Sequence, residues 1–277
     1  MRRALLAPVL LAGATLCQGA EMPAAFRPCI DPSNLPFSNT RGEGLENRIA
    51  ELFAARLGLP VKSYAFPQRM NFIRNTLRYR LPGEDYRCDV VMGIPAGYEQ
   101  ASATAPYYRS TYMLVYPKGN GLDGVKRGAD LLALPAEAAR KLTIGVYDRS
   151  PGATWLARHG WEAQAKIYPI LSPDPEQYPG EIVEKDLVLG AIDAAIVWGP
   201  IAGYFAKRVR GADLKLVALE SEPGVRFDYA IAMGVRYGEP EWKRILEKLI
   251  ADNRADIAKI LREYNVPLVD ERGELLP

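Results

Sequence analysis

The chain has 277 residues, 35 of them lysine or arginine and 33 acidic, and 48% are hydrophobic. The first 20 residues contain two arginines and no acid, so the rest is formally neutral. Nothing in this balance implies the basic footprint of a nucleic-acid-binding protein or a polybasic membrane patch. The length suits one large domain or two moderate ones.

The chain begins MRRALLAPVLLAGATLCQGA, which combines two positive charges, a short apolar stretch and small residues at its end. This pattern is typical of a secretory signal, and the apolar stretch is too short to span a bilayer. We expect residues 1–20 to be removed and the mature protein to be exported to the periplasm without membrane insertion. A lipoprotein anchor at Cys17 is a weaker alternative, because the bulky Leu16 precedes that cysteine.

The first half of the mature chain alternates strands and helices. A parallel sheet is therefore expected, with ligands meeting the carboxyl ends of its strands, at 31–37, 67–71 and 94–100. The expected elements are a strand at 26–30, a helix at 43–58 closed by Gly58, a strand at 61–66, a helix at 68–80 and a strand at 88–94.

The same alternation begins again further along, which predicts a second α/β unit. Ser150 and Pro151 provide an N-cap and a first helical residue for its first helix. The expected elements are strands at 141–147, 165–170, 191–198 and 213–219, and helices at 150–160 and 180–190.

Two long β-prone segments bracket the second unit: PYYRSTYMLVY at 106–116 and RFDYAIAMGV at 226–235. Apolar residues at helical spacing then predict a helix throughout 239–264. Two α/β units joined by two crossing strands resemble a periplasmic solute-binding protein of type II. The resemblance implies lobe 1 at 21–112 plus 228–277, lobe 2 at 113–227, a binding cleft between them and closure by hinge motion.

Amino-acid-binding members of this fold hold the ligand carboxylate with an arginine and its amine with an aspartate. The corresponding stretch PAGYEQASATAPYY (95–108) has no arginine or lysine, and Trp198-Gly199-Pro200 stands where the aspartate is expected. Burying a zwitterion without counter-charges is costly, so an ordinary α-amino acid is a poor candidate ligand.

Four blocks, FPQRMNFIRNTL (66–77), CDVVMGIPAGYEQ (88–100), APYYRSTYMLVY (105–116) and DAAIVWGPIAGYFAKR (193–208), resemble a narrower family. These are the MxaJ/XoxJ-type accessory proteins of methanol dehydrogenase clusters. The resemblance implies a periplasmic, non-catalytic role beside a pyrroloquinoline-quinone (PQQ)-dependent alcohol dehydrogenase, in its maturation or function. We expect this quinoprotein as partner, a small ligand as a second partner, and no cofactor of the chain's own.

Several residues are candidates for the cleft, each with a purely structural explanation beside the functional one. Asp31 either contacts a ligand or simply forms a turn with the proline that follows it. Arg69 either reaches the mouth of the cleft or is a solvated residue at the start of a helix. Tyr98, Tyr107 and Tyr108 could form an aromatic wall of the cleft, although tyrosines also pack well in a hydrophobic core. One of the three is expected to face the cleft. The candidates are Asp31, Gln68, Arg69, Pro95, Tyr98, Tyr107, Arg109, Ser150 and Trp198.

Three of these candidates lie at hinge and helix positions. Arg109 pairs either with an acid across the hinge or in a weak surface ion pair. Ser150 either lies at an anion site or simply caps its helix. Trp198 either stacks on a flat ligand or fills the cleft, and in both cases is expected to face it.

Cys29 and Cys88 remain after signal removal, and an oxidising compartment favours a disulfide between them. Two free thiols are the alternative, because Cys29 lies late in its strand and Cys88 early in its own, which separates them if the strands are parallel neighbours.

Catalysis finds little support in the sequence. His159 is the one histidine, so a His-based metal cluster is excluded and no metal site is expected. Glu43 and Glu46 are assigned to the solvated face and N-terminal dipole of the first helix. A solute receptor of an ABC transporter for a small non-zwitterionic ligand is the main alternative to the accessory role, and an enzyme such as a dehydratase is third.

Overall fold

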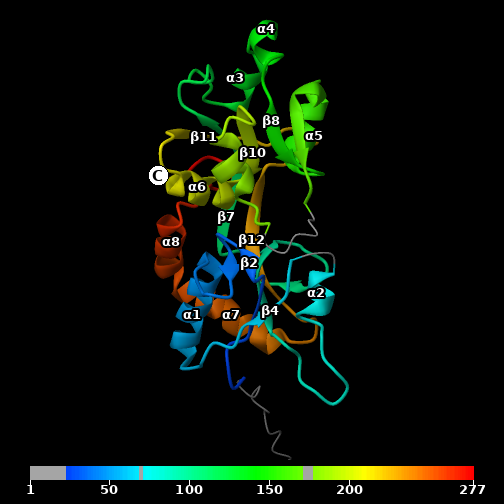
Figure 1. Cartoon of the computed structure of the whole chain (residues 1–277). Coiled ribbons are helices and arrows are strands. Elements are labelled where there is room, and N and C mark those ends of the chain that lie inside the picture. The colour runs from blue at the N-terminus through cyan, green and yellow to red at the C-terminus, as the bar shows by residue number, and fades with distance from the viewer. Residues whose placement is uncertain (1–22, 69–70, 171–176) are drawn as a thin grey trace, which may run out of the picture.

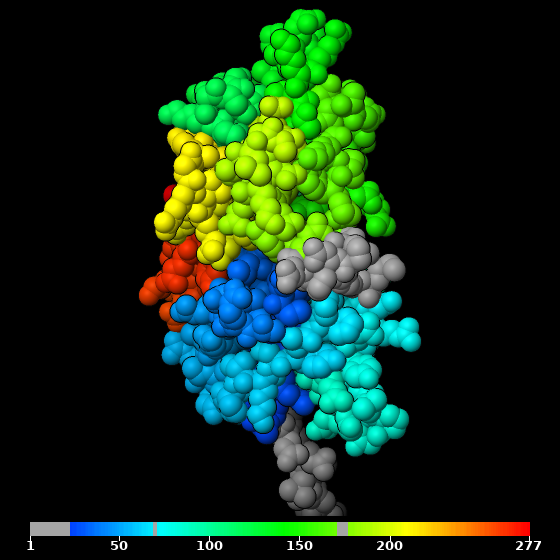
Figure 2. All heavy atoms as spheres, in the orientation of Figure 1, coloured from blue at the N-terminus to red at the C-terminus, as the bar shows by residue number. Residues whose placement is uncertain are grey.

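The computed structural model describes residues 23–68, 71–170 and 177–277, so the predicted signal and Cys17 lie outside the described residues. The chain forms two bodies stacked one on the other. Blue and cyan segments from the N-terminal part build one body, and green to yellow segments build the other (Figures 1 and 2). They are called lobe 1 and lobe 2 below, with the boundaries predicted from the sequence.

Lobe 1 contains a mixed sheet. The strands β4 and β5 each pair in parallel with β1, as the sequence predicts, and β12 joins β5 antiparallel. A short hairpin of β2 (Ser33–Asn34) and β3 (Ser38–Asn39) follows β1. The sheet strands are β4 (Tyr64–Ala65), β1 (Pro28–Ile30), β5 (Val90–Pro95), β12 (Asp228–Val235) and β6 (Ser102–Ala103), and the helices are α1 (Leu45–Leu57), α2 (Phe72–Asn75), α7 (Pro240–Asp252) and α8 (Arg254–Glu263).

In lobe 2, β8 lies between β10 and β9 and is parallel to both. The strands are β10 (Ala194–Trp198), β8 (Ile144–Tyr147), β9 (Ala165–Tyr168) and β11 (Leu214–Ala218), and the helical elements are α3 (Gly128–Leu132), α4 (Ala136–Ala139), α5 (Pro151–Arg158), η1 (Glu162–Gln164), η2 (Ile182–Leu187) and α6 (Gly199–Arg208).

One strand, β7 (Tyr108–Pro117), belongs to both lobes (Figure 1). Residues 108–111 pair with β12, whereas residues 112–115 pair with β10 and residues 113–117 with β11, all antiparallel. The segments predicted to cross between lobes are thus β7 and β12, side by side.

The buried apolar side chains form separate cores. Lobe 1 has one core between α1, α7, α8 and the sheet, built around Phe26 and Phe53, and another around the cysteines. The two cores of lobe 2 draw their buried members from residues 113–227. This distribution is compatible with the predicted lobe boundaries, which stay a prediction. The C-terminal segment runs from α8 back to lobe 2, where Asn265 donates a hydrogen bond to the carbonyl of Gly203.

Helix α1 forms as its sequence predicts. Leu45, Ile49 and Phe53 are fully buried on one face. Gly58 ends the helix with φ of 66°, a left-handed conformation that glycine adopts without steric cost.

Three predicted helices differ from the structure. The helix expected at 68–80 is reduced, among the described residues, to the single turn of α2, and the one at 180–190 is a π-helix, η2. The helix expected throughout 239–264 breaks at Asn253, whose side-chain amide donates to the carbonyl of Leu249 at 2.8 Å. Asparagine competes in this way with the helical hydrogen bonds of its own backbone, so α8 starts anew.

The edge of lobe 1 is stabilised by a disulfide and a buried ion cluster. Cys29 and Cys88 form a disulfide with their Cα atoms 5.3 Å apart. The offset expected for two parallel strands is present in the ladder, where Cys29 pairs with Val91, but Cys88 precedes β5 and lies outside that ladder, and the two cysteines meet. Next to it, the buried carboxylate of Asp89 accepts from Arg27 at 2.6 Å and from Arg236 at 2.7 Å.

Candidate functional site

A pocket of about 260 Å³ lies where the two lobes meet, and it is called the interlobe pocket below. Lobe 1 contributes α1 and the carboxyl end of β5, lobe 2 contributes the end of β10, and the crossing strands β7 and β12 supply one wall. The lining residues are Phe37, Glu46, Gln68, Gly93, Pro95, Tyr108, Tyr112, Trp198, Tyr229 and Ile231.

Trp198 is placed in the pocket by the start of α6. Gly199 and Pro200 begin that helix, and a Cβ on Gly199 would lie 2.5 Å from the carbonyl oxygen of Thr111. Only glycine allows this close approach to β7. The indole ring lies 5.4 Å from the ring of Tyr112 and 5.9 Å from that of Tyr229. Trp198 also packs against cores of both lobes, so it lines the pocket and helps to join the lobes.

Glu46 is the one acidic side chain among the described lining residues. It is only 8% exposed, and no hydrogen bond or ion pair joins its carboxyl group to another side chain in the described part of the chain. Burial raises the pKa of Glu46 to about 8, and the negative charge of Asp31 adds to the rise. The assignment of Glu46 to a solvated helix face was therefore wrong.

Gly93 provides the room for this carboxyl group. A Cβ on Gly93 would overlap with Oε1 of Glu46, closer than any real contact. The strand β5 thus lacks a side chain where Glu46 reaches over it. The carboxyl group is thereby positioned at the pocket lining, which Gly93 shares.

Of the three candidate tyrosines, Tyr108 lines the pocket. Successive residues of a strand point to opposite faces, so its neighbour Tyr107 points elsewhere and donates its hydroxyl proton to the carbonyl of Met92 at 2.9 Å. Tyr98 packs against the core around the cysteines. One of the three tyrosines thus lines the pocket, as expected, but it is Tyr108 and not either of the candidates Tyr98 and Tyr107.

The loop candidates divide between the pocket and its support. Asp31 is outside the lining; its carboxylate accepts from the backbone N–H of Ser33 at 2.8 Å and also from that of Gln68. This matches its interpretation as a turn former. Gln68 and Pro95 line the pocket, and Gln68 also accepts from the side chain of Asn34 at 2.7 Å. Arg69 lies outside the described residues.

Arg109 pairs with Asp228 across the two crossing strands at 2.6 Å, and both side chains are largely shielded from solvent. Burial works against ionisation of Asp228, but hydrogen bonds from Ser221 and Arg109 outweigh it and hold the pKa of Asp228 below its usual value. Neither residue lines the interlobe pocket. The pair therefore joins the crossing strands rather than forming part of the pocket.

Ser150 and His159 lie at opposite ends of α5. The Ser150 hydroxyl accepts from the backbone N–H of Ala153 at 3.2 Å, which is ordinary capping, and Ser150 is outside the interlobe pocket. His159 contacts Glu222 at 3.0 Å and stacks edge-on against Trp155. In the described part of the chain, His159 has an acid beside its ring but no serine, threonine or cysteine hydrogen-bonded to it.

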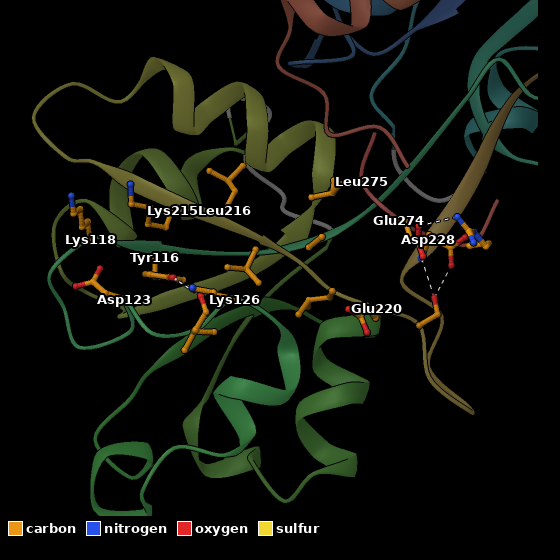
Figure 3. A pocket seen from close by; sticks show the side chains of 17 residues that line it. Tyr116, Lys118, Asp123, Lys126, Lys215, Leu216, Glu220, Asp228, Glu274 and Leu275 are labelled. Atoms are coloured by element: carbon orange, nitrogen blue, oxygen red, sulfur yellow. Dashed lines mark hydrogen bonds and ion pairs between the residues drawn. The ribbon is translucent and has the colours of Figure 1, made fainter. Parts of the chain in front are cut away.

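A second cavity of about 990 Å³, called the lobe 2 groove below, lies along β11 beside the C-terminal segment (Figure 3). Lys118, Lys126 and Lys215 gather at one end, and Glu220 and Glu274 lie at the other (Figure 3). The sequence did not predict this groove, because the C-terminal segment that completes it was assigned to lobe 1 only.

The described residues provide neither a metal cluster nor a membrane-spanning helix. They contain no group of three or more histidine, cysteine or acidic side chains placed to hold a metal ion. In that same part of the chain, none of the helices combines the length and apolar character needed to cross a membrane.

Some pocket residues that were not predicted nevertheless carry recognisable signals in the sequence. Glu46, Ile49, Ala50 and Phe53 are spaced as one helical face, which indicates that Glu46 points inward with the apolar residues. Tyr112 follows Tyr108 by four residues in a strand and so shares its face. Tyr229 and Phe37 gave no such local signal, since only the pairing of distant segments brings them to the pocket.

Known proteins resemble the chain over most of its length, although no protein-family model matches it. Protein MoxJ of Paracoccus denitrificans is 26% identical over 258 residues, which cover 88% of this chain and 89% of MoxJ. The crystal structure of MxaJ from Methlophaga aminisulfidivorans MPT has a TM-score of 0.73 at 23% identity and covers 88% of this chain and 100% of MxaJ, which shows the shared fold.

A third relative establishes the family. The periplasmic binding protein XoxJ from Methylobacterium extorquens AM1 is 33% identical, with a TM-score of 0.71, over 89% of this chain and 100% of XoxJ. This confirms the resemblance carried by the sequence blocks at 66–77, 88–100, 105–116 and 193–208. The chain belongs to the MxaJ/XoxJ-type family of periplasmic binding proteins.

Proposed function

We propose that the protein is a periplasmic, non-catalytic accessory protein of a PQQ-dependent alcohol dehydrogenase of the methanol dehydrogenase type, and that it acts by binding that enzyme. Membership of the MxaJ/XoxJ-type family is the observation that supports this proposal. The signal-like residues 1–20, expected to be cleaved, support a periplasmic location.

The site geometry is consistent with a binding protein rather than an enzyme. The interlobe pocket has one carboxyl group, and the described residues provide neither a metal cluster nor a base in contact with a nucleophile there. Acid–base catalysis generally requires a second positioned group.

The binding test uses the mature protein and the quinoprotein alcohol dehydrogenase of the same genome. The dehydrogenase is prepared without and with its quinone, and each form is mixed with the accessory protein and analysed by size-exclusion chromatography with light scattering. We expect a co-eluting complex with at least one form, and a preference for one form would identify the step at which the protein acts. An unrelated periplasmic binding protein serves as the control.

Absence of a complex at high micromolar concentration of both proteins would overturn the accessory proposal. The second candidate function is then a receptor that delivers a small non-zwitterionic solute to an ABC transporter. The interlobe pocket favours this candidate, since a protein that acted only through its outer surface would not need it.

A further inference from the structure

We propose that the interlobe pocket binds a small organic ammonium ion, whose positive charge pairs with Glu46 and whose alkyl groups lie against the rings of Trp198, Tyr112 and Tyr108. The proposal concerns the isolated protein and does not depend on the dehydrogenase partnership, so either can fail without the other.

The first support is the carboxyl group without a partner. A buried carboxylate is costly unless a cation or several hydrogen-bond donors satisfy it, and proteins rarely leave one unpaired. Glu46 is only 8% exposed and has no such partner among the described residues, yet Gly93 leaves space for it at the pocket lining. A cationic ligand would supply the missing partner.

The second support is the aromatic wall. Trp198 lies against Tyr112 and Tyr229 from the two crossing strands, and Tyr108 lines the pocket beside them. The face of an aromatic ring attracts a cation, and tryptophan does so most strongly. Arg226 lies over the ring of Tyr229, at 5.1 Å from its centre, but it does not line the pocket, so the rings available to a ligand cation are those of Trp198, Tyr112 and Tyr108.

The third support defines the ligand. A volume of about 260 Å³ is small for a ligand pocket and restricts the occupant to a compact molecule. None of the described lining residues is a lysine or an arginine, so these residues offer no counter-charge for a carboxylate. The ligand class is therefore an alkyl- or methyl-substituted ammonium ion without an acid group, rather than an amino acid.

The charges around Glu46 determine how binding depends on pH. Asp31 raises the pKa of the Glu46 carboxyl group further, and burial raises the pKa values of the neighbouring Tyr107 and Tyr108 hydroxyls, so both tyrosines stay neutral. An ammonium ion prefers the ionised Glu46, which the empty pocket contains mainly above a pH of about 8. Affinity for a permanent cation should therefore increase with pH.

The test uses isothermal titration calorimetry with choline and its neutral isostere 3,3-dimethylbutan-1-ol, because choline keeps its charge at every pH. Choline should bind at least roughly 30-fold more tightly than the alcohol at pH 9, since a desolvated cation–π contact contributes about 2 kcal/mol. With a Glu46 pKa of about 8, the choline affinity should increase about 90-fold from pH 6 to pH 9.

Variants separate the two parts of the site. Glu46→Gln keeps the shape of the side chain but removes its charge, so this variant should bind choline more weakly at pH 9 and with no pH dependence. Trp198→Ala should weaken choline binding at every pH. Glu43→Gln, at an acid near the start of α1 that is outside the pocket, should leave binding unchanged. Circular dichroism establishes that each variant is folded.

Three results would overturn the proposal: equal binding of choline and the alcohol, an affinity that falls as pH rises, or no binding of choline at millimolar concentration. All three are measured on the wild-type protein and need no variant to fold. A falling affinity would instead show that the pocket binds its ligand with Glu46 protonated, as a hydrogen-bond donor.

Discussion

The buried Glu46 predicts an unusual pH dependence of stability. The folded protein holds this carboxyl group protonated up to a pKa of about 8, whereas the unfolded chain releases the proton near 4.5. Between these values the folded state binds more protons, so this group's contribution to stability falls as pH rises, by about 1.4 kcal/mol per pH unit. By pH 7 the accumulated loss is about 3 kcal/mol.

The substitution Glu46→Gln removes this loss, because glutamine has a similar shape and does not titrate. Relative to wild type, the variant should gain about 3 kcal/mol in free energy of unfolding between pH 4 and pH 7. Any constant effect of the amide group appears at both pH values and cancels. Other ionisable groups, such as Asp228, titrate equally in both proteins and cancel as well.

The measurement is urea denaturation followed by circular dichroism, on wild type and variant at pH 4 and pH 7. Glu137→Gln, at an acid whose side chain is 85% exposed, serves as the control and should show only a small difference between the two pH values. A Glu46→Gln difference from wild type that is the same at both pH values would refute the reasoning, since Glu46 would then titrate as it does in the unfolded chain.

Three further changes test other features of the fold. Arg236→Met removes one of the two guanidinium partners of the buried Asp89 and should lower the free energy of unfolding by about 3 kcal/mol, measured in urea. An alkylating reagent should modify Cys29 and Cys88 only after reduction, as measured by mass spectrometry, and labelling of both thiols without reductant would contradict the disulfide. Changing both cysteines to alanine should lower the free energy of unfolding by about 4 kcal/mol, given their separation of 59 residues. Gly93→Ala should lower the free energy of unfolding by about 1–3 kcal/mol and also weaken choline binding, because the added Cβ displaces the Glu46 carboxyl group. Unchanged stability and binding would show that this carboxyl group moves freely.

The fold was predictable because its signals are local and repeat along the chain. The apolar spacing of α1, the alternation of strands and helices in both halves and the two long β-prone segments at 106–116 and 226–235 each indicate their own element. Helix ends were less predictable. The break at Asn253 depends on a side chain that bonds to its own backbone, which apolar periodicity does not record.

The candidate site was predictable only in part. Trp198, Gln68 and Pro95 follow strands at their carboxyl ends, so strand order alone suggests that they approach the pocket. Glu46 lies instead in the first turn of a helix, where an acid has an ordinary explanation in the helix dipole. Its burial depends on the absence of a side chain at Gly93, which lies on a different element, and such a pairing of distant residues is not visible in one sequence.

The pairing of the crossing strands has a consequence for protein engineering. Thr111 on β7 and Asp228 on β12 are opposite each other in the antiparallel ladder, so the chain leaves lobe 1 and returns to it at adjacent points. Topologically, residues 112–227 are an insertion into the turn of a β-hairpin. A two-residue turn such as Asn-Gly spans that distance. Lobe 1 can therefore be produced as one continuous, shortened polypeptide. A foreign domain whose N- and C-termini lie close together can be inserted at the same point.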